Sequence, residues 1–541
     1  MEDKRVRDLS LIVLVVLGVA SVASAYLGTG ATAKFLLAFY PLIVVLIGVA
    51  FLKQGSLNMA FVGWGLAIVL AVSNFGNTPF DTGISSIVGI LKSFGIAFTV
   101  AATMLLIYIM QEVGALKTIS TVIKKQVAGS ELQALYVGVG FGSFLSALGV
   151  VTPALFPPLL MAMGFSQLAA ISVAVLGYDP TTSFSLLGIP ITLPSQLFGL
   201  NAIEFAFKIA IFLPIISTGF AFAILWLVGG RKSMRKGLIP GLICGLSLAG
   251  ACLVSAGLDF TLGNELIPLR IIGVIAGLFT MLTLTVYGRM SHVKNTDTTS
   301  SGENVERSEA WRSFSPLVIL TILAAIVSIP AIGTMLSNSP GTLEVIAVGT
   351  QKVDLDILSQ IYTWIFIATL ISLSTLKPTY NQLRNGVNLW LKRTPAPVLT
   401  FMVYFAVSFV MSGSTMNQVL GDTLAIIFGS AYIYVSSSLG FLGAIVGGSE
   451  TTSNVLFYKI QKTASDTIGL SPTQFTTLYG GHAVAGGVAS SVTPSKINNA
   501  VATVAAGKET ESIIMRKHLV VALLLTVVSC LLGGLLITLG L

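Results

Sequence analysis

Residues 440–457 read GFLGAIVGGSETTSNVLF. This stretch places a pair of glycines, a run of hydroxyl side chains and one acid, Glu450, between two apolar segments. Glycines allow a sharp turn of the backbone, and hydroxyl groups can cap the start of a helix. Irregular backbone at membrane depth is tolerated only inside protein or beside a water-filled cavity. We therefore expect a helix interrupted at a binding site, with a capping box at an ordinary loop as the alternative.

The rest of the chain has the composition of a membrane protein. Of its 541 residues, 54% are hydrophobic and only 10% are charged, and the mean hydropathy is +0.90, whereas roughly a quarter of the residues in soluble domains are charged. Apolar runs long enough to cross a hydrocarbon core of about 30 Å recur from end to end. Examples are residues 9–26, 35–52, 94–110, 209–228 and 518–539. The sequence predicts an all-α polytopic membrane protein with about 12–14 transmembrane helices.

Charged residues are distributed unevenly between the loops. Basic clusters at residues 117–125, 231–236, 289–312, 377–393 and 508–517 alternate with neutral to acidic loops. The positive-inside rule then places the amino terminus in the cytoplasm and the carboxyl terminus outside. The net charge of +8 reflects this orientation, so we expect no nucleic-acid partner.

A polar stretch at residues 292–309 divides the chain and is too short for a soluble catalytic domain. We expect a first membrane half at residues 1–287, a cytoplasmic linker at 288–313 and a second membrane half at 314–541. Each half contains one interrupted unit, at about residues 135–200 and 436–505, whose helices are broken and re-entrant.

The two interrupted units resemble each other. In the first, GFS at residues 164–166 precedes DPTTS at 179–183, and in the second, GLS at 469–471 precedes SSVTP at 490–494. Counting crossings from the nearest basic loops, the two units enter the membrane from opposite sides. This arrangement predicts inverted repeats, whose interface is the usual place of a transporter's binding site.

The interrupted helices suit a small anion, because the start of a helix presents free N–H groups and the positive end of its dipole. Lys496 could attract such an anion, or could extend its amine to lipid headgroups. His482 could exchange protons near neutral pH, or could be a structural residue. The chain has no GxxxxGK[ST] run, no HExxH or paired-cysteine metal motif and no nucleophile with a base partner. We expect no cofactor, no metal and no enzymatic activity.

Several motifs together resemble the lactate permease family. They are the stretches at residues 141–145, 188–191, 448–457, 492–497, 507–509 and 516–518. The resemblance extends over most of the chain, and it implies uptake of L-lactate, and often of D-lactate or glycolate, in symport with a proton. It also implies a likeness to ion-coupled carboxylate transporters with two re-entrant hairpins.

The chain departs from the family pattern at several positions. Ser146 stands where the family typically has an acid, Tyr178-Asp179 replaces Asn-Thr, and His482 replaces Asn. Glu450 stands where Asp is usual and keeps an acid in the second unit. The proton site could therefore have moved to Asp179, with His482 assisting, or the substrate or coupling ion could differ.

From these patterns we predict a secondary transporter in the cell membrane that imports lactate with protons. A sodium-coupled carboxylate transporter, an anion channel and an intramembrane enzyme are the alternatives, and a homodimer is compatible with the resemblance. The expected proton-coupling residues are Asp179, Glu450 and His482. The expected substrate-binding residues are Thr152, Thr181, Thr182, Ser183, Ser449, Thr451, Thr452, Ser453, Asn454, Ser490, Ser491 and Thr493.

Overall fold

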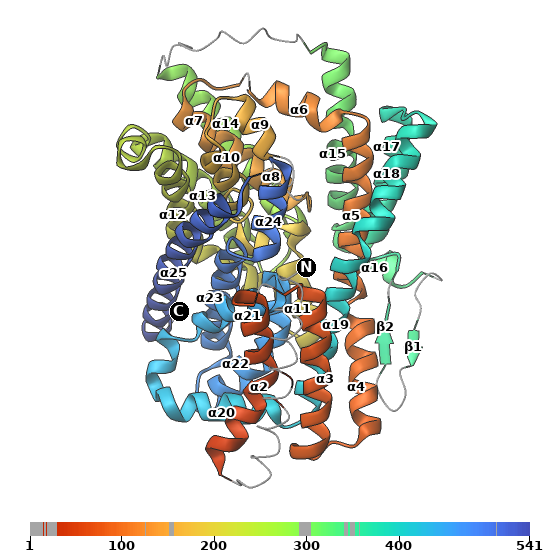
Figure 1. Cartoon of the computed structure of the whole chain (residues 1–541), viewed down its shortest axis with the longest axis vertical. Coiled ribbons are helices and arrows are strands. Elements are labelled where there is room, and N and C mark those ends of the chain that lie inside the picture. Colours follow the sequence, from red (N-terminus) through yellow and green to blue (C-terminus); the bar gives the residue numbers. More distant parts are fainter. Residues whose placement is uncertain are drawn as a thin grey trace.

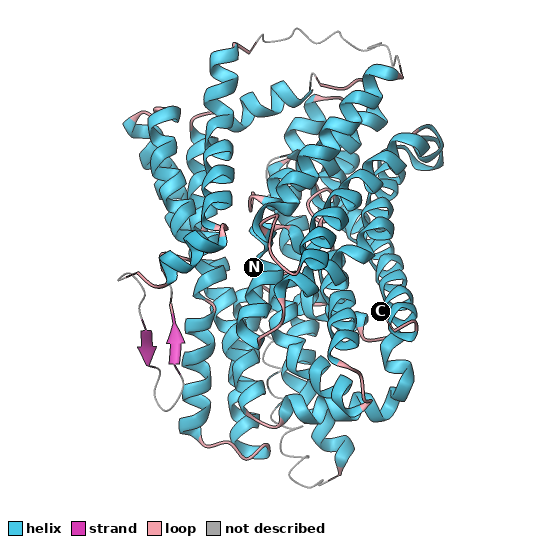
Figure 2. Ribbon diagram, turned by 180° about the vertical axis from the view of Figure 1, so that it is seen from behind, coloured by secondary structure: helices cyan, strands magenta, loops and turns pink. Residues whose placement is uncertain are grey.

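The computed structural model describes residues 30–540, except residues 53, 125, 151–155, 292–304, 340–343, 347–351, 356 and 505, and also describes residues 15 and 18. Within these residues the chain is almost entirely helical. The strands β1 (Glu344–Ile346) and β2 (Lys352–Asp354) form a small antiparallel hairpin at one side (Figure 2). Apart from residues 15 and 18, the predicted first helix lies outside the described residues, and so does half of the predicted linker, residues 292–304.

Along the chain, the described helices fall into two series. Helices α13 (Leu238–Leu262) and α14 (Leu269–Met290) lie between them in the sequence (Figure 1). The first series consists of α2 (Ala31–Ala50), α3 (Ser56–Asn74), α4 (Pro79–Lys92), α5 (Phe94–Glu112), α6 (Ala115–Lys124), α7 (Ser130–Leu135), η1 (Tyr136–Phe141), α8 (Gly142–Ala147), α9 (Phe156–Ala162), α10 (Gln167–Leu176), η3 (Thr182–Phe184), η4 (Leu186–Gly188), α11 (Ile189–Phe198) and α12 (Ala202–Lys236). The second consists of α15 (Arg307–Val327), α16 (Pro330–Ser337), α17 (Ile361–Leu376), α18 (Tyr380–Arg393), α19 (Pro395–Gly413), α20 (Met416–Phe428), η5 (Gly429–Tyr434), α21 (Ser437–Gly447), α22 (Glu450–Thr467), α23 (Pro472–Ser490), α24 (Pro494–Thr503) and α25 (Lys508–Thr538).

The length and composition of these helices confirm an all-α polytopic membrane protein. In the described part of the chain, nine helices are long and apolar enough to cross a membrane, or ten if the pair that bends by 106° between η5 and α21 is one span. The number is below the predicted 12–14 because several apolar helices, such as α10 with 10 residues and α17 with 16, are too short to count as spans. Residues 9–26 cannot be counted as a span, since only residues 15 and 18 of this run are described.

Each series contains one long arm. The first arm, α4 with α5, covers 34 residues, and the second arm, α18 with α19, also covers 34 residues. The two arms lie against each other, since Gln382 Nε2 donates to the carbonyl of Glu112 at 3.2 Å and Trp390 Nε1 donates to that of Ala101 at 2.8 Å. The start of the second arm thus lies beside the end of the first, and the arms are antiparallel.

The two interrupted units have matching local structure. Gly164 and Gly469 both have positive φ angles, of +95° and +76°, which glycine adopts without a steric penalty. Two residues later, Ser166 caps α10 by accepting from the amide of Ala169, and Ser471 caps α23 by accepting from the amide of Gln474. The repeat predicted from the sequence is therefore present as a repeated helix end and helix start.

The units also run in opposite directions. Gln167, at the start of α10, donates to the carbonyl of Val504 just after α24, at 3.1 Å. Asp179, just after α10, pairs with Lys496 at the start of α24. Helices α10 and α24 are therefore antiparallel. In Figure 1, α7 and α9 of the first unit lie near the top, and α20 and α22 of the second lie near the bottom.

The interrupted units are the most buried part of the protein. Every residue from Phe475 to Ser490 of α23 is buried, and so are most residues of α22. Helices α13, α14 and α25 instead expose apolar side chains, for example Leu246, Leu282 and Leu524. In a membrane protein such side chains face lipid, so the broken helices lie inside the bundle and can carry polar groups.

Candidate functional site

The site lies where the helices of the two units break. Helix α10 ends at Leu176 and α11 begins at Ile189, whereas α23 ends at Ser490 and α24 begins at Pro494. The first break contains three residues other than glycine with positive φ, namely Thr182 (44°), Leu186 (50°) and Leu187 (54°). Such conformations cost of order 1–3 kcal/mol each and cluster at functional sites. The density of strained residues marks this break as a candidate site.

A cavity of about 180 Å³ opens between the breaks and the two arms. Drug-sized ligands usually occupy roughly 300–1,000 Å³, so this cavity suits a small molecule. Its polar side chains come from the interrupted units and its apolar wall comes from α5 and α19. The lining residues are Ile96, Val100, Met104, Gly149, Tyr178, Asp179, Ser185, Leu186, Pro190, Phe401, Ser449, Glu450, Thr451, Ser490 and Lys496.

One ion pair lies in the cavity wall. Lys496 Nζ is 2.7 Å from Asp179 Oδ1, and the Asp179 side chain is only 5% exposed. The same ammonium group donates to Ser490 Oγ and lies 4.1 Å from the centroid of the Tyr178 ring. An ammonium group has three donors, so one remains for a ligand. Asp179 Oδ2 is buried and has no hydrogen-bond partner within the described residues.

The second acid of the cavity is Glu450, the first residue of α22. Ser183, from the other unit, donates a hydrogen bond to Glu450 Oε1. Ser449 caps the helix by accepting from the amide of Thr452 at 3.2 Å. Gly487 of α23 lies directly behind this acid, since a Cβ there would be 2.7 Å from Glu450 Oε2. The packing of α22 against α23 therefore has space for the Glu450 carboxyl group because residue 487 has no side chain.

The three charged groups together are negative. With Asp179 and Glu450 ionised and Lys496 protonated, the wall carries a net charge of −1 (−1 −1 +1). A further carboxylate in the cavity would make the net charge −2 in a region shielded from water, where like charges repel strongly. Binding of an anion here therefore favours the uptake of a cation, either a proton or a metal ion.

One cavity contains three of the twelve predicted substrate-binding residues and two of the three predicted proton-coupling residues. Asp179, Ser449, Glu450, Thr451 and Ser490 line the cavity. Behind them, Ser183 bonds to Glu450, Thr452 Oγ1 lies 2.9 Å from Ser449 Oγ, and Asn454 Nδ2 donates to the carbonyl of Pro190 at 3.0 Å.

The remaining predicted residues lie around this group. Thr493 donates to the carbonyl of Ser490 at 2.9 Å and Ser491 to that of Val488 at 2.7 Å. The buried hydroxyls of Thr181 and Thr182 have no partner within the described residues. Thr152 lies outside the described residues.

His482 and Ser453 do not line the cavity. They hydrogen-bond to each other at 3.3 Å, and the imidazole ring stacks on that of Tyr479 at 5.4 Å. Both side chains are fully buried in the second unit. The structure thus separates His482 from the two acids with which it was grouped.

Some residues of the site were not found from the sequence. The role of Lys496 was left open between anion binding and a contact with lipid headgroups, and neither Tyr178 nor the apolar wall was assigned to the site. Ile96, Val100, Met104 and Phe401 lie in ordinary apolar helices, whose composition is the same whether a side chain faces lipid or a ligand. No local signal could have identified them.

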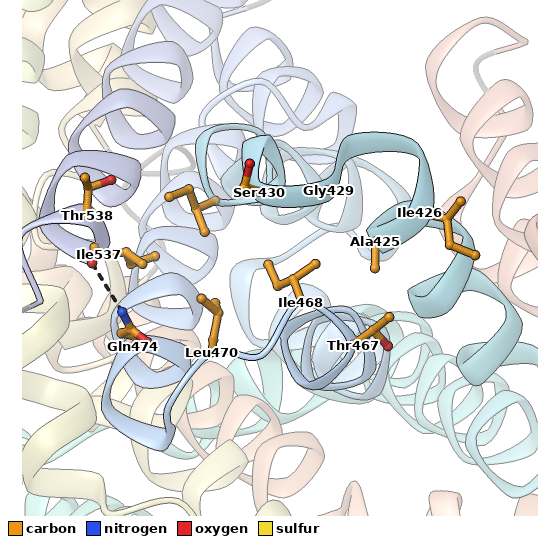
Figure 3. A pocket seen from close by; sticks show the side chains of 11 residues that line it. Ala425, Ile426, Gly429, Ser430, Thr467, Ile468, Leu470, Gln474, Ile537 and Thr538 are labelled. Carbon is orange, nitrogen blue, oxygen red and sulfur yellow. Dashed lines mark hydrogen bonds between the residues drawn. The ribbon is translucent and has the colours of Figure 1, made fainter.

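A second cavity, of about 530 Å³, lies at the ends of α20, α22, α23 and α25 (Figure 3). Its lining includes Ile426, Ile468, Leu470 and Gln474, whose side-chain amide donates to the carbonyl of Ile537 at 3.4 Å. No charged side chain lines it in the described part of the chain, and none of the predicted site residues does. It is larger than the first cavity but, in the described part of the chain, offers an anion only uncharged donors such as Ser430 and Thr467.

The chain is similar to known proteins over most of its length. The family model described as L-lactate permease matches residues 34–540. The chain is 26% identical to the L-lactate permease of Salmonella typhimurium, over 75% of this chain and 79% of that one. It is 24% identical to the L-lactate permease of Bacillus subtilis, over 88% and 91% of the two chains.

Two further comparisons add detail. The glycolate permease of Escherichia coli is 24% identical, over 81% of this chain and 84% of that one. Neisseria gonorrhoeae MtrF is described as representing a class of antimetabolite efflux pumps. Its solved structure covers 90% of this chain at 13% identity. Its TM-score of 0.42 is too low to establish a shared fold.

Proposed function

The chain belongs to the L-lactate permease family, and we propose that it imports L-lactate or a related small 2-hydroxy monocarboxylate, such as D-lactate or glycolate, in symport with protons. The relatives named for lactate and for glycolate support this substrate class. The alternating basic loops support a cytoplasmic amino terminus in the cell membrane.

The observation that carries the proposal is the juxtaposition of Lys496, Asp179 and Glu450 in one small cavity. The free donor of Lys496 and the hydroxyls of Ser449 and Thr451 supply donors for a carboxylate. The amino-terminal end of α22 adds the positive end of a helix dipole. Acceptors for the substrate hydroxyl are present too, since Asp179 Oδ2 has no partner within the described residues.

Charge balance supports the proton. Lys496 neutralises Asp179 through their ion pair, whereas no ion pair of Glu450 occurs within the described residues. When lactate adds its negative charge, the site would carry −2, and protonation of Glu450 returns it to −1, the charge it had before lactate bound. Lactate bound with a proton therefore adds no net charge to the site, and each uncompensated charge in a low-dielectric medium is expensive. We therefore assign the transported proton to Glu450, with Asp179 as the alternative carrier.

A sodium ion is the second candidate for the coupling cation. The buried oxygens Thr181 Oγ1, Thr182 Oγ1 and Asn454 Oδ1 have no hydrogen-bond partner within the described residues. Hydroxyl and carbonyl oxygens beside an unwound helix are typical ligands of sodium in transporters. This observation supports testing sodium directly alongside protons.

Uptake of labelled L-lactate into proteoliposomes tests the proposal. An inward proton gradient should drive accumulation above the external concentration in the absence of sodium, and unlabelled D-lactate and glycolate should compete. Collapse of the gradient with a protonophore should abolish accumulation. Accumulation that requires sodium and ignores the proton gradient would support the sodium alternative. Ion conductance without accumulation would indicate a channel.

A further inference from the structure

A chain of buried side-chain hydrogen bonds passes through His482, outside the cavity. Tyr432 Oη donates to Gln461 Oε1 at 2.6 Å, and Gln461 Nε2 donates to the carbonyl of Ser436 at 2.8 Å. The same amide nitrogen lies 3.0 Å from His482 Nδ1. On the other side of the ring, Nε2 lies 3.3 Å from Ser453 Oγ, and that hydroxyl donates to the carbonyl of Gly440 at 2.9 Å.

The partners of the imidazole fix its protonation. The carbonyl of Ser436 can only accept, so it is the nitrogen of the Gln461 amide that faces it and also faces His482 Nδ1. Nδ1 must therefore accept and carries no proton. Ser453 has one hydroxyl hydrogen, which it donates to Gly440, so it must accept from Nε2–H. The ring is thus neutral, with its proton on Nε2.

The surroundings of the ring hold it in this state. The aromatic rings of Tyr479 and Phe457 lie 5.4 Å and 6.1 Å from it, and a Cβ at Gly440 would lie 1.9 Å from the His482 carbonyl oxygen. Two phenols face the ring, that of Tyr479 by stacking and that of Tyr432 through Gln461. Within the described residues, the ring has no interaction with a charged side chain. A second ring proton, on Nδ1, would point at the N–H of Gln461 and be repelled by it.

This network connects the helices that position Glu450. Ser453 follows Glu450 by three residues in α22, Gly440 lies in α21, and His482 lies in α23 together with Gly487, which faces Glu450. We propose that His482 is a positioning residue that stays uncharged through transport and locks the α21–α22 hairpin against α23. This inference rests on the proposed function for its effect on transport, but not for its claim about protonation.

The roles of the two ring nitrogens predict which substitutions succeed. A side-chain amide has an acceptor oxygen and a donor NH₂ group, so Asn or Gln can accept from Gln461 and donate to Ser453. Leucine can do neither and leaves two buried groups unpaired. In the Gln461→Glu variant the carboxylate cannot donate to Nδ1, so the ring should gain a proton there and become an imidazolium.

Nitrogen NMR of protein labelled at histidine tests the protonation claim without any substrate. The chain has three histidines, and the His482 signal is identified by its absence from the His482→Asn spectrum. We expect a neutral ring with its proton on Nε2 throughout pH 5–8, the range in which free histidine changes charge. In Gln461→Glu the same signal should become that of an imidazolium at neutral pH. Titration of the wild-type signal within pH 5–8 would overturn the proposal.

Transport assays test the positioning claim. Uptake by His482→Asn or His482→Gln should stay within about threefold of wild type with an unchanged pH profile, and His482→Leu should lose at least about tenfold, since unpaired buried partners are costly. The Asn and Gln variants keep the test valid even if the Leu variant does not fold. A pH profile displaced in both amide variants would overturn the inference. A wild-type protein that carries no lactate would contradict the proposed function but leave the NMR result intact.

Discussion

Lys496 Nζ lies 2.7 Å from Asp179 Oδ1, although the two residues are 317 positions apart in the chain. This ion pair joins the break between α10 and α11 to the break between α23 and α24, and it places one cation in a cavity that also holds Glu450. The two inverted units therefore meet through opposite charges at the point where a small anion would bind. The first prediction concerns this pair.

Lys496→Met should abolish lactate uptake and destabilise the protein, because it leaves Asp179 buried without a counter-ion. Removing one partner of a buried ion pair costs about 3–5 kcal/mol. The double variant Lys496→Met/Asp179→Asn should regain most of the stability but not the transport. Thermal unfolding in detergent and proteoliposome uptake measure the two effects separately.

Lys462 provides the matched control, since its ion pair with Asp466 has side chains that are 40% and 57% exposed. Exposed pairs contribute at most about 1 kcal/mol, so Lys462→Met should change neither property noticeably. Equal loss of stability in both lysine variants would contradict the importance given to the buried pair.

Glu450→Gln should uncouple transport from the proton gradient. The amide imitates a protonated carboxyl group and can still accept from Ser183, which bonds to this side chain. We expect exchange of labelled for unlabelled lactate to persist while accumulation driven by a proton gradient is lost. Full gradient-driven accumulation by this variant would move the proton to another group, with Asp179→Asn as the next variant to assay.

Gly487→Ala should reduce transport strongly, and Gly486→Ala should not. A Cβ at residue 487 would lie 2.7 Å from Glu450 Oε2 and 2.8 Å from Thr182 Cβ, whereas a Cβ at residue 486 would lie 3.4 Å from its nearest neighbour, Glu450 Cγ. Both substitutions change helix propensity equally, by about 1 kcal/mol in favour of alanine. A lower initial uptake rate in Gly487→Ala than in Gly486→Ala therefore measures the effect of filling the space behind Glu450. Similar rates in the two variants would show that transport does not need this space.

Phe401→Ala should broaden the substrate range. Phe401 forms part of the apolar cavity wall, and each methylene group accommodated in an apolar pocket changes discrimination by about 1–3 kcal/mol. Competition with lactate uptake should therefore improve about tenfold or more for 2-hydroxybutyrate, relative to wild type. Phe409→Ala, on the same helix but beside Lys92, should leave the ranking of substrates unchanged. An equal change in the ranking of substrates in both variants would contradict the role of Phe401 in the substrate-binding wall.

The sequence predicted the architecture well because its signals are local. In both units a glycine with positive φ ends one helix and a serine two residues later caps the next. These residues are Gly164 and Ser166 in the first unit and Gly469 and Ser471 in the second. Apolar runs predicted the spans, and Gly448 and Ser449 predicted the break before α22, where Gly448 has a φ of +74°. Each of these features depends on residues a few positions apart.

The composition of the site was harder to predict because it depends on distant contacts. Nothing near Lys496 indicates that Asp179 will neutralise it, so an anion-binding role and a lipid-facing role were equally consistent with the sequence. Likewise, the partners of His482 come from residues 21 and 29 positions away, and only they distinguish a neutral ring from a proton carrier. The arms contribute their apolar wall through packing that leaves no pattern in the sequence.

The central claim, that lactate binds together with a proton at Glu450, is tested most directly by counting protons during binding. Lactate is added to purified protein in weakly buffered detergent solution, and a pH indicator records the protons taken up. We predict uptake of about one proton for each lactate bound by wild type at a pH where Glu450 is ionised, and none by Glu450→Gln with lactate still bound. Binding of lactate by wild type without proton uptake would contradict the claim.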